Sequence, residues 1–207
     1  MSDPLHWDTV YGAREEERLT WFEAAPDLSA ELVLRHAPPG LPVLDVGGGA
    51  SRLADRLLAA GRGPVTVLDL SAAALRIGRD RLGAAADFVV ADVTRWTPDR
   101  AYGLWHDRAA FHFLTAAGDR AAYAATLDAA LAPGGRAVVM TFAPEGPETC
   151  SGLPVCRYAP EEIAAEIGRH LPGGLRLVEG GGHVHLTPME NRQAFSFAVL
   201  ARGDDRS

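Results

Sequence analysis

Short apolar runs recur along the chain and alternate with amphipathic segments. The apolar runs cover residues 43–46, 65–69, 86–91, 102–108 and 136–142, and their length and valine content are typical of buried strands. Between them, residues 51–60, 71–82 and 117–131 carry apolar side chains at helical spacing. This alternation of strand and helix predicts an α/β fold, with a doubly wound, mostly parallel sheet and helices on both faces.

The two ends of the chain follow other patterns. Residues 1–35 are polar and aromatic and are expected to form helices that cover the rest as a lid, or simply pack on the core. Residues 143–160 lack periodicity and are expected to be a loop, followed by a helix over 160–170. Residues 175–179 and 194–200 are predicted to be an antiparallel pair of strands. We therefore expect a single domain over 1–207, with its core at 41–202.

Three glycines, Gly47 to Gly49, link the first strand to the first helix of the core. Such a turn lets a ligand touch bare backbone, and the helix N-terminus that follows favours an anionic group. Asp45 at the end of the strand favours an ammonium or another donor instead. The dinucleotide-binding pattern G-x-G-x-x-G fails at its third glycine, where Arg52 stands, which argues against a dehydrogenase.

Carboxylates stand at the ends of the next three strands: Asp69, Asp92 and Asp107. The carboxyl ends of parallel strands meet at one edge of the sheet, where ligands of open α/β folds bind. Asp69 is placed to accept both hydroxyls of a ribose. Its alternative role is to cap the next helix, although Ser71 is better placed for that.

Composition removes several classes of function. The formal net charge is −7, so long-range attraction gives no help in binding nucleic acid. There is no lysine, which excludes lysine-base and Schiff-base chemistry, and two cysteines are too few for a disulfide scaffold. No apolar run is long enough for a membrane helix, and the N-terminus lacks a signal-peptide core. We expect a cytoplasmic protein.

Several motifs in order resemble those of the class I S-adenosylmethionine-dependent methyltransferases. They are Asp45-Val46-Gly47-Gly48-Gly49, the acids Asp69 and Asp92, and Leu131-x-Pro133-Gly134-Gly135 before an apolar strand. The string Trp105-His106-Asp107-Arg108, with His112-Phe113-Leu114 after it, is similar to a group of small bacterial members, and more distantly to thiopurine-type and protein-lysine methyltransferases. The resemblance implies a Rossmann-like, seven-stranded sheet with an antiparallel C-terminal strand.

The same resemblance implies S-adenosylmethionine as cofactor and S-adenosylhomocysteine as product. It assigns the adenine amino group to Asp92, whose alternative role is that of a turn residue, and it has the backbone amide of Val93 facing the ring. Arg14 would pair with the methionine carboxylate. The cofactor-binding residues expected on this basis are Trp7, Tyr11, Arg14, Asp45, Gly47, Gly49, Asp69, Leu70, Asp92, Val93 and Asp107.

The methyl acceptor would meet residues that follow the fourth and fifth strands. Asp107 is the first candidate to orient or deprotonate the acceptor and His112 the second; otherwise Asp107 is a cap or an ion pair, and His112 a packed core residue. Arg108 is expected to contact the substrate. Arg157 and Tyr158 are expected either to bind a polar substrate or to fasten their loop.

We expect no metal site, because His183 and His185 have no acidic or cysteine partner nearby in sequence. The function predicted is transfer of a methyl group to a small-molecule O, N or S acceptor by in-line displacement. The alternatives are a protein-lysine methyltransferase and a cofactor-binding module without catalysis. Neither a nucleic acid nor a membrane is expected as a partner, and the protein would be a monomer or a homodimer.

Overall fold

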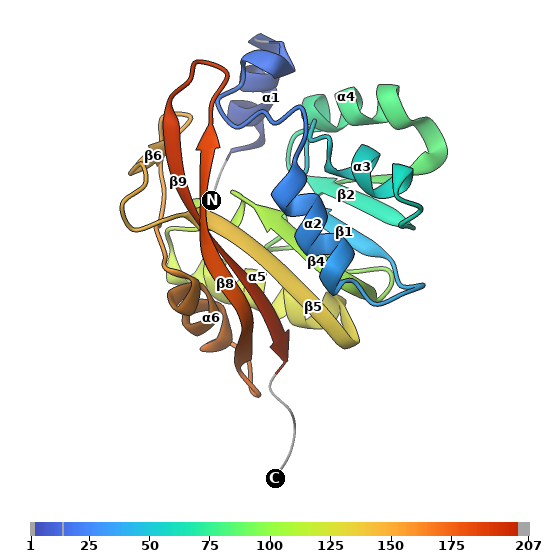
Figure 1. Cartoon of the computed structure of the whole chain (residues 1–207), viewed down its shortest axis with the longest axis vertical. Helices are drawn as coiled ribbons and strands as arrows, with labels where there is room; N and C mark the ends of the chain where they lie inside the picture. The colour runs from blue at the N-terminus through green and yellow to red at the C-terminus, as the bar shows by residue number, and fades with distance from the viewer. Residues whose placement is uncertain (1–2, 14, 203–207) are drawn as a thin grey trace.

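A seven-stranded sheet forms the centre of the molecule (Figure 1). The computed structural model describes residues 3–13 and 15–202. The strands of the sheet are β1 (Val43–Val46), β2 (Val65–Asp69), β3 (Asp87–Val90), β4 (Tyr102–Arg108), β5 (Leu131–Phe142), β8 (Leu175–Leu186) and β9 (Arg192–Arg202).

The strands lie in the order β3-β2-β1-β4-β5-β9-β8. Neighbours from β3 to β5 pair in parallel, and β9 runs antiparallel to both β5 and β8. The predicted doubly wound sheet with an antiparallel C-terminal strand is therefore confirmed. The chain progresses outward from β1 in both directions, so β1 and β4 flank the point at which strand order reverses.

Helices cover both faces of the sheet. The helices α2 (Asp27–His36), α3 (Leu53–Ala59) and α4 (Ala72–Leu82) share one apolar cluster with Val43 and Val67, and α5 (Ala117–Ala130) and α6 (Pro160–Gly168) share another with Leu44 and Leu68. Alternate residues of a strand point to opposite faces of the sheet. The apolar residues at odd positions of β1 and β2 therefore pack in the first cluster, and those at even positions pack in the second.

The N-terminal helix α1 (Pro4–Ala13) lies beside α4, at the upper edge of the molecule in Figure 1. Its Asp8 carboxylate accepts hydrogen bonds from the Ser71 hydroxyl at 2.6 Å and from the Ala73 amide at 3.2 Å. These bonds lower the pKa of Asp8. A residue of α1 thus helps cap the first turn of α4, which Ser71 itself caps by accepting from the Ala74 amide.

Several elements differ from their predicted bounds. Helix α3 begins at Leu53 rather than at 51, although the Ser51 hydroxyl still accepts from the Leu53 amide at 3.1 Å. Strand β5 begins at Leu131 and runs through the Pro-Gly-Gly segment. The predicted loop at 143–160 contains a small hairpin of β6 (Thr149–Cys150) and β7 (Leu153–Pro154).

Strand β8 is also longer than predicted, because it continues through Gly180 to Gly182 and carries His183 and His185. A Cβ at Gly181 would lie 2.8 Å from the ring of Phe197 on β9. These glycines therefore let an aromatic ring lie flat across the edge strand instead of forming a turn.

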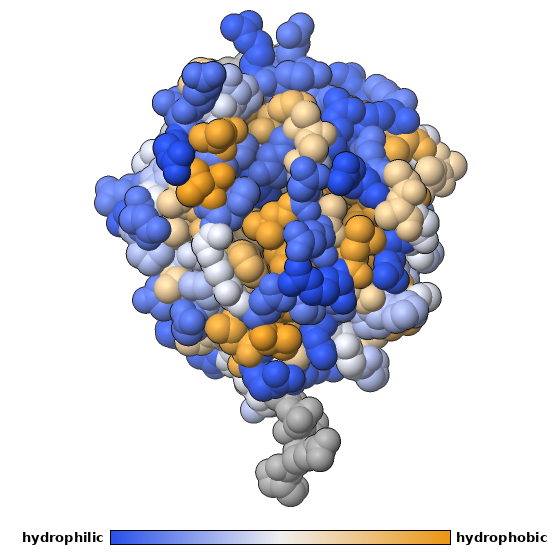
Figure 2. All heavy atoms as spheres, in the orientation of Figure 1, coloured by the Kyte–Doolittle hydropathy of each residue, from blue (hydrophilic) through white to orange (hydrophobic). Residues whose placement is uncertain are grey.

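Hydrophilic residues and separate apolar patches share the face of the molecule shown in Figure 2. Within the described ranges, no helix combines the length and apolar character needed to cross a membrane.

Candidate functional site

An open cavity of about 880 Å³, its mouth included, lies at the carboxyl ends of the parallel strands. The residues that line it come from the N-terminal segment, from the tips of β1 to β4 and from β6: Trp7, Tyr11, Trp21, Val46, Gly47, Leu68, Asp69, Leu70, Ala91, Asp92, Val93, Arg108, Ala109, Ala110, Phe113, Leu114 and Cys150.

Two carboxylates stand at one end of this cavity. Asp69 is buried at the end of β2, where it accepts a 2.8 Å hydrogen bond from the Ser71 amide. Burial, together with the charge of Asp45, raises the pKa of Asp69 to about 7. Asp92 follows β3, and its Oδ1 accepts from both the amide and the hydroxyl of Thr94. This end can accept hydrogen bonds from the hydroxyl and amino groups of a ligand.

Aromatic rings of the N-terminal segment cover the cavity. Trp7 contacts Trp21 edge-on, with ring centroids 5.9 Å apart, and contacts Phe113 at 5.1 Å. The indole of Trp21 donates to the Tyr11 hydroxyl at 3.2 Å, and burial raises the pKa of Tyr11. The rings join the N-terminal segment to the short 3₁₀ helix Phe111–Phe113 that follows β4, so they form an apolar cover on this side of the cavity.

The protein's own side chains pack closely around the glycine turn. A Cβ would lie 2.7 Å from Ala110 at Gly47, 2.5 Å from the Asp45 carboxylate at Gly48, and 2.8 Å from the Tyr11 hydroxyl at Gly49. Gly47 and Gly49 also have positive φ, 66° and 46°. Each position therefore needs glycine in the folded chain even before a ligand is considered.

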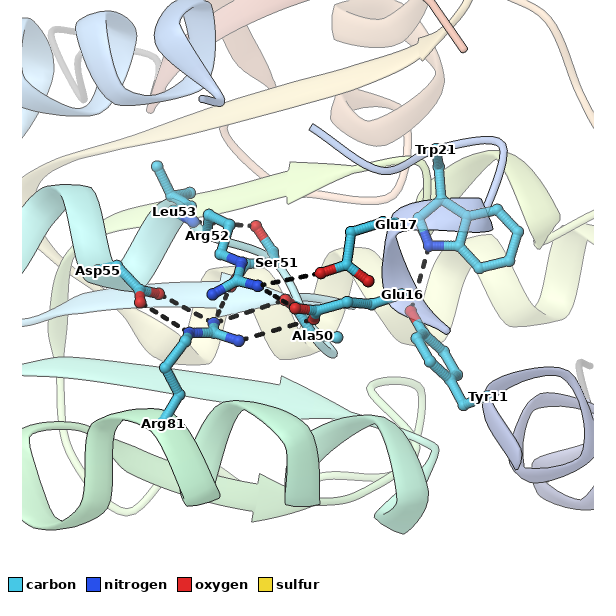
Figure 3. Close-up of polar contacts among 10 residues, drawn as sticks. All are labelled: Tyr11, Glu16, Glu17, Trp21, Ala50, Ser51, Arg52, Leu53, Asp55 and Arg81. Atoms are coloured by element: carbon cyan, nitrogen blue, oxygen red, sulfur yellow. Dashed lines mark hydrogen bonds and ion pairs between the residues drawn. The ribbon is translucent and has the colours of Figure 1, made fainter. Parts of the chain in front are cut away.

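An ion cluster fastens the N-terminal segment to the helices behind that turn (Figure 3). Glu16 forms an ion pair with Arg52, and its other oxygen lies 3.7 Å from Arg81. Arg81 in turn donates to Asp55 at 2.7 Å and to the carbonyl of Ser51 at 2.7 Å. The Glu16 side chain is 11% exposed, so solvent screens this contact only partly.

Arg108, at the tip of β4, brings a largely buried cation to the cavity wall, whereas Asp92 follows β3 on the other side of β1 and β2. Its guanidinium donates to Glu23 at 2.9 Å and to the Trp21 carbonyl at 3.1 Å, and lies 5.0 Å from the centre of the Phe195 ring. Burial lowers the pKa of Arg108. For Glu23, burial is outweighed by the hydrogen bond with His185 and the charge of Arg108, so its pKa is lowered.

A second cavity, of about 570 Å³ with its mouth, lies behind the glycine turn and shares Tyr11, Trp21, Gly47 and Arg108 with the first. Asp45 and His106, from neighbouring strands β1 and β4, stand side by side in its wall. The Nδ1 of His106 lies 2.7 Å from Oδ1 of Asp45, and both side chains are 3% exposed. Their other polar atoms, His106 Nε2 and Asp45 Oδ2, are buried without a hydrogen-bond partner.

The structure brings together most of the residues expected to bind a cofactor. Trp7, Tyr11, Gly47, Asp69, Leu70, Asp92 and Val93 line the first cavity, and Asp45 lines the second. Gly49 supports the turn beneath Tyr11. Arg14 lies outside the described residues.

Asp107 departs from its expected position. Its side chain points away from both cavities, is fully buried, and accepts hydrogen bonds from the amides of Ala110 and Phe111 and from the Tyr123 hydroxyl at 2.8 Å. Burial raises its pKa to about 6 despite these bonds. This geometry fixes the turn after β4 and gives the carboxylate no access to an acceptor in the first cavity.

His112 is likewise outside the lining of either cavity. Its ring is fully buried against Phe113 and Phe142, and neither ring nitrogen has a hydrogen-bond partner. Burial and the nearby charge of Arg108 lower its pKa to about 3, so at neutral pH it is an uncharged core residue. The alternative of a packed histidine fits this geometry.

Of the three residues expected to contact the substrate, only Arg108 reaches the cavity. Arg157 donates to the Gly146 carbonyl and to Glu148 at 3.1 Å each, which fastens the 143–160 segment. Tyr158 packs on Phe111 at 5.7 Å. Among residues 3–13 and 15–202 no group of three possible metal ligands comes together.

Several residues of the two cavities were not predicted as site residues from the sequence, among them Trp21, Phe113, Cys150 and His106. Strand alternation could have identified His106, because it shares a face of β4 with Arg108 and not with Trp105 and Asp107. The burial of Cys150 raises its pKa to about 11, so it is a neutral thiol in the wall. Its position depends on the 149–154 hairpin, for which the sequence carries no periodic signal.

Comparisons with known proteins agree with this architecture. A family model described as a methyltransferase domain matches residues 43–135, and no curated protein matches the chain. A solved structure described as "Conversion of a Disulfide Bond into a Thioacetal Group during Echinomycin Biosynthesis" is similar with a TM-score of 0.78 and 22% identity, over 99% of this chain and 94% of that one.

Two further solved structures share the fold. The Burkholderia thailandensis 1,6-didemethyltoxoflavin-N1-methyltransferase, with bound 1,6-didemethyltoxoflavin and S-adenosylhomocysteine, has a TM-score of 0.76 at 20% identity, over 99% and 92% of the two chains. The glycopeptide N-methyltransferase MtfA, complexed with S-adenosylmethionine, has a TM-score of 0.66 at 18% identity, over 89% and 96%. At these identities the likeness is one of fold.

Proposed function

Since the chain carries a methyltransferase domain with the class I fold, we propose that it binds S-adenosylmethionine and transfers the methyl group to a small-molecule acceptor. The observation that carries the proposal is the meeting of Asp69, Asp92 and the turn at Gly47 in one cavity at the carboxyl edge of the sheet. These are the features that the family uses for ribose, adenine and the amino-acid tail.

The residues present fit such a cofactor. The buried carboxylate at the tip of β2 lines the cavity and is suited to ribose hydroxyls, because a carboxylate can accept further bonds besides those from the backbone amides of Ser71, Leu70 and Gly49. Asp92 and Val93 stand at the tip of β3, the next strand of the sheet, where an adenine ring attached to that ribose would lie. Tyr11 and Gly47 continue the wall toward β4.

When bound, S-adenosylmethionine supplies an activated methyl group on a sulfonium. The chain's own residues then have to hold the acceptor in line and keep water out, since a desolvated nucleophile reacts faster. Trp7, Trp21 and Phe113 form an apolar wall suited to this task, and Arg108 offers a largely buried cation to a polar acceptor. We propose that Asp107 and His112 support this wall from behind and do not exchange protons with the acceptor.

A small acceptor is favoured by the cover of aromatic rings. A protein-lysine methyltransferase needs an open acidic groove that threads a lysine side chain, whereas here Trp7, Tyr11 and Trp21 close over an apolar cavity. Two structurally similar enzymes are named for a toxoflavin precursor and for a glycopeptide, which supports an acceptor other than a protein lysine. A silent cofactor-binding module is the remaining alternative.

The proposal is tested by binding and then by turnover. Titration calorimetry is expected to show binding of S-adenosylmethionine and S-adenosylhomocysteine and none of NAD. Fractions of a metabolite extract would then be screened for formation of S-adenosylhomocysteine. In a parallel assay, methylation of protein bands would be measured in a lysate. Labelled protein bands without any small-molecule product would favour the lysine alternative, and binding without turnover in either assay would favour the silent module.

A further inference from the structure

The titratable side chains that line the first cavity fall into two groups. Asp69 and Asp92, at the tips of β2 and β3, are the two that the proposed function assigns to the nucleoside. The others among the described lining residues are Tyr11, Arg108 and Cys150. The methyl acceptor therefore has to react beside these three groups, and their chemistry limits what it can be.

None of these three groups is a base at neutral pH. Burial raises the pKa of Tyr11, whose hydroxyl already accepts a hydrogen bond from the Trp21 indole. Burial also raises the pKa of Cys150 to about 11, and the guanidinium of Arg108 is always protonated. The described lining residues on this side of the cavity therefore offer no group that takes a proton from an alcohol or a phenol.

The neighbours of Arg108 in the second cavity do not supply a base either. The atoms of Asp45 and His106 that are free of their mutual contact, Oδ2 and Nε2, are buried. Glu23 accepts from Arg108 at 2.9 Å and lies 3.2 Å from Nδ1 of His185. These contacts outweigh burial and lower the pKa of Glu23, so its carboxylate holds a proton weakly.

Arg108 carries positive charge that its neighbours compensate only in part. Its side chain is 12% exposed and lines both cavities. Two of its nitrogens donate to Glu23 and to the Trp21 carbonyl, which leaves some of the five N–H donors of a guanidinium unused. Burial lowers the pKa of Arg108 in spite of the charge of Glu23. A further anion beside Arg108 would be stabilised by it.

We infer that the acceptor reacts as an anion, with a thiolate sulfur or a carboxylate oxygen held beside Arg108 as its nucleophilic atom. This inference rests on the proposed function and names the class of its substrate. The step balances without a base. A lone pair of the anion forms a bond to the methyl carbon, the bond from that carbon to the sulfonium breaks, and its electron pair leaves the sulfur neutral. No proton is released.

The same charge disfavours neutral nucleophiles. An amine would become a substituted ammonium next to Arg108, and like charges repel strongly beside an apolar wall such as that of Trp21 and Phe113. An anion has the opposite effect, because its charge and that of the sulfonium cancel during the reaction.

Binding to the complex of the protein with S-adenosylhomocysteine tests the inference before the natural acceptor is known. The probes are two pairs of similar shape: benzoate with benzamide, and thiophenol with phenol in mildly alkaline buffer, where thiophenol is ionised and phenol is not. Calorimetry is expected to show about 10-fold or greater preference for the anion in at least one pair. The pair that shows it distinguishes a carboxylate from a thiolate acceptor.

Variants of Arg108 connect that preference to its charge. Arg108→Gln is expected to abolish the preference, and Arg108→Lys to restore part of it. The matched control is Arg120→Gln, because Arg120 is also largely buried and pairs with Glu166 at 2.6 Å, but lines neither cavity. This control should keep the full preference for the anion.

The outcomes separate this inference from the proposed function. If wild type did not bind S-adenosylhomocysteine, the proposed function would fall and the inference with it. If it bound S-adenosylhomocysteine but showed no preference for either anion, the inference alone would be overturned, whether or not Arg108→Gln folds. A preference that persisted in folded Arg108→Gln would overturn it as well.

Proton release gives a second measurement on wild type. The acceptor isolated by the metabolite screen would be methylated in weakly buffered solution with an indicator dye, above the pKa of any thiol or carboxyl group that it carries. We expect no release of protons as S-adenosylhomocysteine forms. An alcohol, a phenol or a protonated amine has to release one proton for each methyl group transferred, and that result would contradict the inference.

Discussion

The Tyr123 hydroxyl donates a 2.8 Å hydrogen bond to Oδ2 of Asp107, behind the wall of the cavity. The same hydroxyl accepts from the Trp105 indole at 2.8 Å, so three fully buried side chains form one chain of bonds between β4 and α5. Asp107 also accepts hydrogen bonds from the amides of Ala110 and Phe111. The turn that carries Phe113 into the cavity is thus anchored in the core.

Removing the hydroxyl should therefore weaken the fold. Tyr123→Phe leaves the Trp105 indole without an acceptor and removes one of the two donors to Oδ2 of Asp107, which keeps its bond from the Phe111 amide. We expect the free energy of unfolding to fall by about 1–3 kcal/mol. Urea denaturation followed by circular dichroism measures this. Once an acceptor is found, the pH dependence of kcat should be the same in the variant and in wild type. A shift of its acidic limb to higher pH would restore Asp107 as a base, because the hydrogen bond from Tyr123 lowers the pKa of Asp107.

Asp69 should make cofactor binding depend on pH. Because its pKa is about 7, Asp69 loses its proton as pH rises from about 6 to about 8. Both oxygens of the ionised carboxylate can accept hydrogen bonds from the ribose hydroxyls, whereas one oxygen of the protonated form carries a hydrogen. The affinity for S-adenosylhomocysteine should therefore rise, by up to roughly tenfold. Calorimetry at several pH values measures the effect.

Asp69→Asn is the control for that prediction, because an amide does not titrate. We expect weaker binding by about 1–3 kcal/mol and a flat pH profile. The free energy of unfolding responds in the opposite direction. Between the ordinary pKa of 3.8 and the folded value of about 7, only the native state holds this proton, so the ligand-free wild type loses stability as pH rises and Asp69→Asn does not.

The ion pair of Glu16 should slow the release of the cofactor. Glu16→Gln removes the charge that Arg52 and Arg81 share, which frees the N-terminal segment from the turn behind it (Figure 3). A partly buried pair contributes about 1 kcal/mol, so we expect S-adenosylhomocysteine to dissociate roughly fivefold faster in stopped-flow experiments.

Glu17→Gln is the matched control for the Glu16 variant. Its carboxylate lies 4.0 Å from Arg52 and is 60% exposed, so its removal should leave the dissociation rate unchanged. High salt should speed release from wild type more than from Glu16→Gln. Equal rates in both variants would show that the segment is held by its aromatic contacts alone.

His112 should make the fold sensitive to acid. Its folded pKa of about 3 lies below the ordinary 6.5, so between these values the unfolded state binds more protons and stability is lost as pH falls. In His112→Leu this contribution disappears, which lowers the slope of unfolding free energy against pH by up to about 1.4 kcal/mol per unit. Denaturation of both proteins between about pH 4 and pH 7 measures the difference.

At neutral pH the same variant should be at least as stable as wild type, since it replaces two unpaired nitrogens by apolar atoms. It should also keep its methyltransferase activity. Loss of turnover with an intact fold would instead show that His112 takes part in the reaction.

The sequence predicts site residues correctly where an acid directly follows an apolar run that forms a parallel strand. Asp69 and Asp92 end apolar runs, and the parallel pairing of those runs brings both acids to one edge. Asp107 has the same signature but points to the opposite face of its strand, toward α5. Its orientation follows from alternation along β4, in which Trp105 and Asp107 share one face and His106 and Arg108 the other.

Other features depend on contacts between distant segments. A lid from residues 1–35 and a wall from the 143–160 loop were expected, but the sequence does not indicate that Trp21 and Cys150 are the side chains that reach the cavity, because both positions result from packing of loops against the core. The long β8 was missed because three successive glycines resemble a turn. Only its register with β9, where Phe197 fills the space above Gly181, shows why they are part of a strand.

The tight fit of the turn at Gly47 to Gly49 changes how variants there should be interpreted. A methyl group at any of the three would collide with Ala110, Asp45 or Tyr11 before a ligand arrives. In a saturation screen, variants at these glycines would fail because the protein misfolds. Their failure therefore reports a folding defect and not a defect in ligand binding. The side chain of Asp92 lines the cavity and does not contact this turn. Substitutions at such residues would therefore test ligand binding and not folding.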